Sequence, residues 1–168
     1  MNTILIGLGF TGGFFLLFHA SFLLRRKGPV GRDDPSYWAL SLTYSAGLGF
    51  MLAELIAMPV IRFATWQLPG WGLAILARLW THWSYRHLGD NYTPEADNPS
   101  PSQTLVRSGP YRWFRHPIYL GNALTLIGFF WGAGVRWTWL ALVPYTTVVI
   151  WRVRREEHFL KQKFGKPI

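Results

Sequence analysis

Five stretches of the chain are apolar and nearly free of charge: residues 4–24, 37–61, 71–85, 117–132 and 137–152. A helix that crosses a bilayer needs about 17–25 predominantly apolar residues, and several of these stretches are that long. In lipid the backbone must satisfy its own hydrogen bonds, which favours helices. We therefore predict an all-α fold: a polytopic membrane bundle of about five transmembrane helices, formed by residues 1–168 as a single domain.

Composition narrows the classes of protein further. Half of the residues are hydrophobic, 17% are aromatic and only 15% are charged. The chain has no cysteine, which excludes disulfides and thiol catalysis. Its first residues lack a basic segment, so we expect the first apolar stretch to be a retained helix rather than a signal peptide. The five histidines show no metal-ligand spacing, and we expect no metal.

The distribution of charge predicts a topology. The formal net charge is +9, and most of the 17 Lys and Arg residues follow the first apolar stretch, lie between residues 86 and 115, or lie in the tail. By the positive-inside rule these segments are cytosolic, with the N-terminus outside and the C-terminus in the cytosol. Basic residues so placed contact anionic lipid, so membrane lipids are the expected partners and nucleic acid is not. The expected location is a multi-pass position in the inner membrane of a bacterium or the endoplasmic reticulum of a eukaryote.

This topology divides the chain into three parts. Residues 1–86 would form three N-terminal helices, residues 87–116 a cytosolic loop rich in Pro, Asn, Asp and Ser, and residues 117–168 a helical hairpin with a cofactor-binding tail. Within the helices, Glu54 and Arg78 are charges that we expect to pair with each other. Pro144 is expected to kink or loosen the last helix.

The stretch 105–122, LVRSGPYRWFRHPIYLGN, carries the most chemistry. We place His116 at a helix N-cap and Pro117 at the first helical position, where the missing N–H is not needed. Arg115, His116 and Tyr119 then share one face of the helix. The free N–H groups of a helix N-terminus favour an anionic group, so this segment is a candidate ligand site. Its alternative interpretation is an interfacial anchor of basic and aromatic residues.

A second motif follows near the end of the chain. Residues 155–160 read REEHFL, and Phe164-Gly165 come shortly after. Glu156 and Glu157 can belong to a solvated helix, where Glu157 and Lys161 would form an i,i+4 pair worth a few tenths of a kcal/mol. They can also supply carboxylates to a cationic ligand.

The two motifs together resemble the signature of the isoprenylcysteine carboxyl methyltransferase family and of related phospholipid methyltransferases. The matching residues are Gly109-Pro110-Tyr111 and the run 115–121 in the first motif, and 155–160 with Phe164-Gly165 in the second. The resemblance covers roughly residues 88–166. It implies an integral membrane enzyme that transfers a methyl group from S-adenosylmethionine to a lipophilic acceptor entering from the bilayer, with the active site facing the cytosol.

The resemblance also assigns residues to roles. The implied cofactor-binding residues are His116, Tyr119, Gly121, Asn122 and Glu156. Arg115, Arg152 and Glu157 are the implied catalytic residues. By charge, Arg115 and His116 suit the carboxylate of the cofactor and Glu156 suits its ammonium group. Arg152 or Arg115 would orient an acceptor carboxylate. Glu157 would assist an amine acceptor, which must lose a proton.

The acceptor and the class of protein stay open. The favoured acceptor is a prenylcysteine-like carboxylate, and the alternative is a phospholipid amine. A membrane reductase and a non-catalytic membrane protein or transporter are hypotheses from other classes. Binding of S-adenosylmethionine, of a nicotinamide cofactor, or of neither would separate the three classes.

Overall fold

The computed structural model of the 168-residue chain describes residues 34–58, 64–92 and 104–165. These residues form four α-helices and four short 3-10 helices, and they contain no strand. The α-helices are α2 (Pro35–Ala57), α3 (Leu68–Leu88), α4 (Pro117–Ala133) and α5 (Leu142–Phe164). The 3-10 helices are η1 (Thr65–Gln67), η2 (Gly89–Asn91), η3 (Gly109–Arg112) and η4 (Thr138–Ala141). The all-α prediction is confirmed for this part of the chain, while the expected helix at 4–24 lies outside the described residues.

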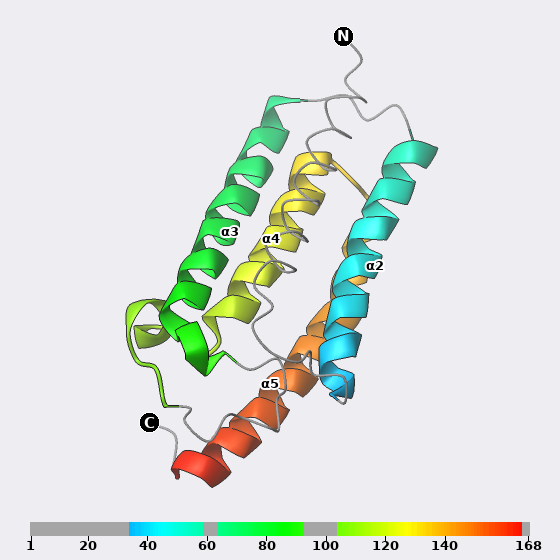
Figure 1. Ribbon diagram of the computed structural model, residues 1–168. Coiled ribbons are helices and arrows are strands. Elements are labelled where there is room, and N and C mark those ends of the chain that lie inside the picture. The colour runs from blue at the N-terminus through cyan, green and yellow to red at the C-terminus, as the bar shows by residue number, and fades with distance from the viewer. Residues whose placement is uncertain (1–33, 59–63, 93–103, 166–168) are drawn as a thin grey trace.

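The four helices run up and down the bundle in turn, with α4 between α2 and α3 (Figure 1). The N-termini of α2 and α4 therefore lie at the same end as the C-terminus of α3 and the C-terminal half of α5. Segments far apart in the sequence meet at this end, which is the lower end in Figure 1.

Small residues allow α3 and α4 to pack closely. The buried positions of α3 recur every three or four residues and are all small: Gly70, Ala74, Ala77, Thr81 and Ser84. A Cβ atom on Gly128 of α4 would lie 2.5 Å from the backbone nitrogen of Ala74, and one on Gly132 would lie 2.7 Å from the ring of Trp71. Faces of this kind let helix backbones approach without loss of packing.

The hydrophobic core joins α4 to α2 and α5. Its buried members include the large side chains of Tyr44, Leu48, Met51, Leu126, Phe129, Phe130 and Tyr145. The turn after α4 follows from Gly134, whose φ of 69° is left-handed and which donates its N–H to the carbonyls of Phe130 and Trp131. Gly134 is therefore the glycine C-cap that ends α4.

Glu54 stabilises the far end of the bundle in a way the sequence analysis did not predict. Its carboxylate accepts hydrogen bonds from the backbone N–H groups of Arg136 (2.6 Å), Trp137 (3.1 Å) and Thr138 (2.8 Å), and from the Thr138 hydroxyl (2.7 Å). It therefore caps η4 and fixes the start of the α5 segment to α2. The expected ion pair with Arg78 is not among the ion pairs of the described residues, because Glu54 faces these donors instead.

Three helices differ by several residues from their predicted bounds. α2 spans Pro35–Ala57 and ends before the predicted residue 61. α3 begins at Leu68, so Leu68-Pro69-Gly70 is its first turn and not a connection. The reason is that a proline in a first turn has no N–H to leave unpaired. Pro144 likewise lies in the first turn of α5, so the kink expected there has no helix interior to bend. α5 continues to Phe164 and carries both glutamates of the second motif.

Among the described residues, α2 is the one helix long and apolar enough to cross a membrane, and α4 is an apolar helix of shorter length. Such a single helix is weak support for a membrane bundle. The charged second half of α5 and the polar end of α3 lower the mean hydropathy of these two helices. Five spans, with an external N-terminus and a cytosolic C-terminus, stay a prediction.

Candidate functional site

The first motif forms a short elbow between α3 and α4. Gly109 begins η3 with a φ of 57°, and a Cβ atom there would lie 2.4 Å from the ring of His87, so glycine lets the elbow dock onto α3. His116 is the N-cap of α4, with no hydrogen bond from its side chain to the helix, and Pro117 follows within the first turn. The predicted N-cap geometry is confirmed, and it leaves the His116 ring available to other groups. The indole N–H of Trp80 donates to the carbonyl of Pro117 (3.0 Å) and ties this end of α4 to α3.

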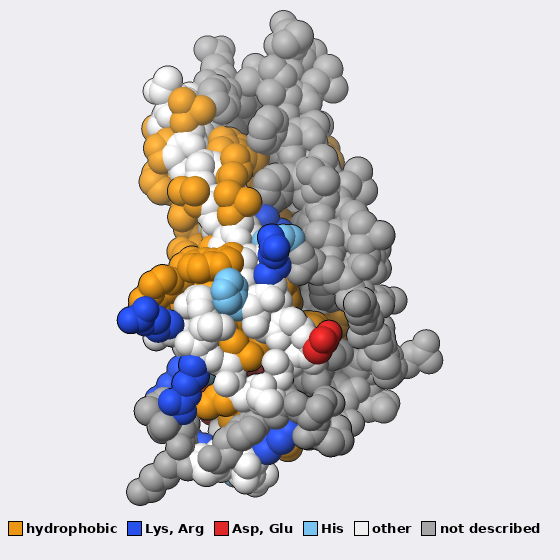
Figure 2. Space-filling model, turned by 60° about the vertical axis from the view of Figure 1, so that its left-hand side comes forward, with side chains coloured by type: hydrophobic (Ala, Val, Ile, Leu, Met, Phe, Trp, Pro, Cys, Tyr) orange, Lys and Arg blue, Asp and Glu red, His pale blue; other side chains and the backbone are white. Residues whose placement is uncertain are grey.

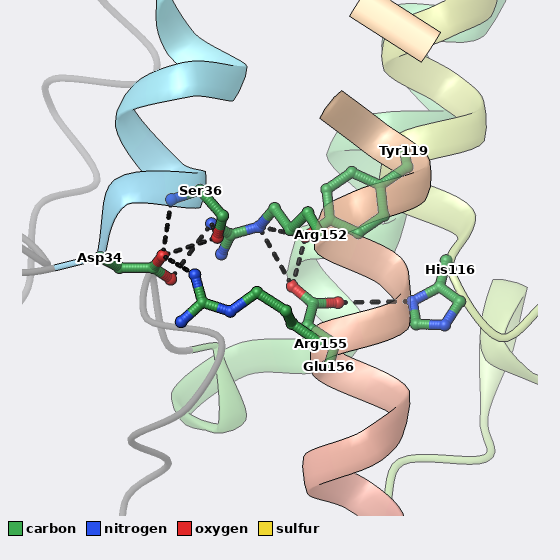
Figure 3. Close-up of polar contacts among 7 residues, drawn as sticks. All are labelled: Asp34, Ser36, His116, Tyr119, Arg152, Arg155 and Glu156. Atoms are coloured by element: carbon green, nitrogen blue, oxygen red, sulfur yellow. Dashed lines mark hydrogen bonds and ion pairs between the residues drawn. The ribbon is translucent and has the colours of Figure 1, made fainter. Parts of the chain in front are cut away.

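Glu156 of α5 is the centre of a compact network of polar side chains (Figure 3). The Tyr119 hydroxyl donates a short hydrogen bond to Oε1 of Glu156 and accepts one from Nε of Arg152 (2.6 Å). Nε of Arg152 also lies 3.2 Å from Oε1 of Glu156, and Nδ1 of His116 lies 3.4 Å from Oε2. The structure thus brings together side chains from α4 and α5 that the two motifs had placed 33 to 40 residues apart.

Glu157 and Arg115 form the more open rim of this network. Nη1 of Arg115 lies 3.7 Å from Oε1 of Glu157, and Nε2 of His116 lies 3.6 Å from the same oxygen. The Arg115 side chain is 58% exposed and that of Glu157 is 33% exposed. At this exposure solvent screens the pair strongly, so its contribution to stability is small. His116 therefore lies between two carboxylates, one inside the bundle and one at its surface.

Two residues of the network were missed by the sequence analysis, Asp34 and Ser36, and Arg155 was matched in the second motif but given no role in the site. Asp34 is the N-cap of α2, and its Oδ1 accepts from the backbone N–H (2.8 Å) and the hydroxyl (2.6 Å) of Ser36. The same carboxylate meets Nη1 of Arg152 at 3.4 Å and Nη1 of Arg155 at 3.2 Å. An Asp followed by Pro and Ser is an N-cap signal in the sequence, yet the predicted helix began only at residue 37. The sequence thus predicts the N-cap, but it does not indicate that Arg152 and Arg155, 118 and 121 residues further along the chain, contact the same carboxylate.

Two buried polar atoms of the stretch 105–122 have no hydrogen-bond partner among the described residues. They are Nε2 of His116 and Oδ1 of Asn122. Buried polar groups are hydrogen-bonded in most proteins, so unpaired ones in a group of charged side chains point to a ligand. These atoms and the carboxylates beside them suit a ligand with both donor and acceptor groups.

Gly121 packs closely against α3. A Cβ atom there would lie 2.2 Å from the Thr81 hydroxyl, 3.0 Å from the Trp80 ring and 3.2 Å from the Ala77 carbonyl. Close packing of α4 on α3 therefore accounts for this glycine without any ligand. Its role in cofactor binding stays a prediction, as do the roles of the other site residues.

An aromatic patch borders the site on the α3 side. It consists of Trp80, Trp83, Trp113 and Phe114, whose ring centroids lie 5.6 to 6.4 Å apart in contacting pairs. Trp113 is 62% exposed and Phe114 is 47% exposed, and both directly precede Arg115. Figure 2 shows apolar side chains over the upper part of this face and most of its basic side chains lower down. Exposed apolar surface beside a charged site is typical of a place that binds an amphiphile or a membrane.

Tyr111, in η3, lies near the same network. Burial raises the pKa of its hydroxyl, and the nearby Tyr85 and Glu156 raise this pKa further. The Tyr111 hydroxyl thus stays protonated at neutral pH and can act only as a neutral hydrogen-bonding group.

The fold and the site define a helical bundle with a charged, partly buried network of side chains at one end, which is the candidate ligand site. Comparison with known proteins gives the family: the sequence pattern of the phospholipid methyltransferase family matches residues 65–167. The chain therefore belongs to that family. It is also similar to the protein-S-isoprenylcysteine O-methyltransferase of Xenopus laevis, with 38% identity over 87 residues that cover 46% of this chain and 28% of that relative. The matched stretch thus spans little more than a quarter of the relative's length, and no solved structure matches the chain.

Proposed function

We propose that the protein transfers a methyl group from S-adenosylmethionine to a lipophilic acceptor at the cytosolic face of a membrane. The observation that carries this proposal is the Glu156 network in a chain of the phospholipid methyltransferase family. His116, which belongs to the network, and Asn122, which follows Tyr119 by three residues on α4, each have a buried atom without a hydrogen bond to any described residue. The family supports the class of reaction, and the local geometry supports the place of the site.

The residues present fit S-adenosylmethionine, which would supply a methyl group already activated by a sulfonium. Glu156 and Glu157 provide negative charge for a cationic ligand. Arg115 offers a partly exposed guanidinium that suits a carboxylate. Nε2 of His116 and Oδ1 of Asn122 offer hydrogen-bonding atoms that no described residue uses. The protein's remaining task in such a displacement is to align donor and acceptor and to exclude water.

Arg152 fits a positioning role better than direct contact with an acceptor carboxylate. Its residue is 3% exposed, and its guanidinium is held by Asp34, Ser36, Tyr119 and Glu156. A substrate carboxylate would have to displace one of these groups. Arg115, which lies at the rim, can be reached without such a displacement.

The favoured acceptor is the carboxylate of a prenylcysteine-like amphiphile, supported by the name of the Xenopus relative. A carboxylate is ionised at neutral pH and needs no base. The aromatic patch at the mouth of the site supports an acceptor with an apolar chain that enters from the bilayer.

A phospholipid amine is the second candidate, and the family's name supports it. An ammonium group must lose its proton before it can attack. His116 and Glu157, 3.6 Å apart at the open side of the site, are placed to accept that proton. A non-catalytic role would leave the paired glutamates and these atoms of His116 and Asn122 without a ligand, whereas a reductase would hold a nicotinamide cofactor in place of S-adenosylmethionine.

The test is calorimetric titration of S-adenosylhomocysteine into detergent-solubilised protein, beside Glu156→Gln and an Asp90→Asn control at an exposed site outside the network. We expect binding by wild type and control and a loss of at least about tenfold in Glu156→Gln, since a charged hydrogen-bond partner is removed. No binding by monodisperse wild type would refute the proposal. Binding of a nicotinamide cofactor in its place would support the reductase hypothesis.

Incubation with methyl-labelled S-adenosylmethionine and both lipid classes identifies the acceptor. A methyl ester is released as methanol by mild base, whereas an N-methyl group resists this treatment. Label lost in base supports the carboxylate acceptor. Label retained in the phospholipid fraction contradicts it and supports the amine.

A further inference from the structure

Asp34 connects the N-terminal part of the chain to the site. It lies at the N-cap of α2 and is 5% exposed, so its carboxylate is buried among protein groups. The matched family region begins at residue 65, so Asp34 and Ser36 lie outside it. The network of Figure 3 nonetheless includes both residues, which face Arg152 and Arg155 of α5.

The contacts of Asp34 and Ser36 orient the guanidinium of Arg152. Nη1 of Arg152 is held by Oδ2 of Asp34 (3.4 Å) and by the Ser36 hydroxyl (3.1 Å), while its Nε faces Tyr119 and Glu156. The guanidinium is therefore fixed from two sides. Because the guanidinium is rigid and planar, a shift of the end that contacts Asp34 also shifts the end that contacts Tyr119 and Glu156.

The charges around Arg152 also connect Asp34 to Glu156. Two guanidiniums, those of Arg152 and Arg155, share the Asp34 carboxylate. Both Asp34 and Glu156 face the buried Arg152, so removing the negative charge of Asp34 leaves Glu156 with a larger share of the attraction to this guanidinium. Glu156 would then be held more tightly by Arg152 and would offer less negative charge to a ligand.

We propose that Asp34 is a positioning residue of the methyltransferase site: it holds Arg152 and thereby keeps Tyr119 and Glu156 in place for a cationic cofactor. The proposal rests on the proposed function, because the cofactor is S-adenosylmethionine. It makes the start of α2 part of the site, although this segment lies outside the region that matches the family.

The test is Asp34→Asn, which keeps a good N-cap residue and removes only the charge. Asp90→Asn is the matched control, because Asp90 is exposed in η2 and lies outside the network. Full-length protein of each kind is titrated with S-adenosylmethionine and with S-adenosylhomocysteine, and thermal unfolding checks that α2 is intact. The two ligands differ by the methyl group and by the sulfonium charge, so their affinity ratio reports the charge of the site.

In Asp34→Asn we expect the Kd for S-adenosylmethionine to rise roughly tenfold and the Kd for S-adenosylhomocysteine to rise clearly less, since only the former carries the additional positive charge. Asp34→Glu, which keeps the charge, should recover most of the affinity ratio. The KM for S-adenosylmethionine should rise more than kcat falls.

An equal loss for both ligands, or no loss in a folded Asp34→Asn protein, would overturn this proposal and leave the proposed function standing. Failure of wild type to bind either ligand would overturn both. A double-mutant cycle of Asp34→Asn and Arg152→Met on the free energy of unfolding adds a readout without cofactor. Additive effects in that cycle would also overturn the proposal.

Discussion

The Tyr119 hydroxyl is a sharp probe of the site, because removing it changes two hydrogen bonds and little else. Tyr119→Phe keeps the ring and deletes the oxygen that donates to Glu156 and accepts from Nε of Arg152. Both partners are charged, and Arg152 is buried. Arg152 keeps its contact with Glu156 at 3.2 Å, so the deletion loosens the network without leaving a charge wholly unpaired.

Tyr145→Phe is the matched control. Tyr145 is 1% exposed, and its hydroxyl is buried with no hydrogen-bond partner among the described residues. The same chemical change there removes no hydrogen bond and relieves a buried unpaired group. We expect the control to keep or slightly raise the free energy of unfolding.

The magnitude follows from the kind of bond that is lost. Hydrogen bonds to charged groups contribute about 1.5–3 kcal/mol each, and the remaining Arg152–Glu156 contact offsets part of the loss. We therefore expect Tyr119→Phe to lose about 1.5–3 kcal/mol, divided between folding and ligand binding. If most of it falls on binding, the affinity for S-adenosylhomocysteine drops about 10- to 100-fold, since about 1.4 kcal/mol corresponds to a factor of ten.

The assay is thermal unfolding and calorimetric titration of the two Phe variants beside wild type in the same detergent. Equal behaviour of Tyr119→Phe and Tyr145→Phe in both measurements would refute the reasoning. It would mean that the Tyr119 hydroxyl holds neither Glu156 nor Arg152 in solution.

Three further predictions follow from other contacts. Glu54→Gln replaces a carboxylate that faces three consecutive backbone N–H groups, and should cost roughly 1.5–3 kcal/mol in the free energy of unfolding; an unchanged melting temperature would contradict the capping role. Gly128→Leu places a Cβ atom 2.5 Å from the backbone of Ala74, so overpacking should lower the free energy of unfolding by about 1–3 kcal/mol or more. Gly72→Leu is the control, because nothing lies within 4 Å of a Cβ atom there, and denaturant unfolding measures the difference between the two variants. Trp113→Ala removes an exposed member of the aromatic patch, so it should raise the KM for the lipophilic acceptor several-fold and leave the Kd for S-adenosylhomocysteine unchanged. Kinetics and calorimetric titration measure the two constants, and an equal rise in both would contradict a role for the aromatic patch in acceptor binding.

The parts of the site that the sequence predicted are those that depend on neighbours along the chain. His116 and Pro117 form an N-cap because of their order, and this geometry was predicted correctly. Arg152 and Glu156 are four residues apart on one helix, which places them on one face, and the structure brings them to 3.2 Å. The order of two adjacent residues is enough for the first result, and helical periodicity is enough for the second.

The rest depends on contacts between segments that the sequence does not order in space. Glu54 was expected to pair with Arg78, because a buried charge suggests another charge as its partner. It faces three backbone N–H groups instead, since the turn after α4 brings these donors to the end of α2. Asp34 was missed for the same reason, because its partners on α5 reach it only through the up-and-down order of the helices. Pattern analysis finds such a residue as an N-cap but cannot say what else its carboxylate meets.

The buried position of Arg152 also bears on why the network exists. Removing a guanidinium and its carboxylates from water costs several kcal/mol per ion, and well-packed apolar side chains of similar volume often give equal or greater stability. Stability alone therefore does not account for a 3% exposed arginine between Asp34 and Glu156. The network meets the N-terminus of α4 at the end of the bundle where His116 and Asn122 have unpaired buried atoms. A charged interior that is costly to build, placed beside atoms with no partner in the described part of the chain, is what a binding site for a small charged ligand requires.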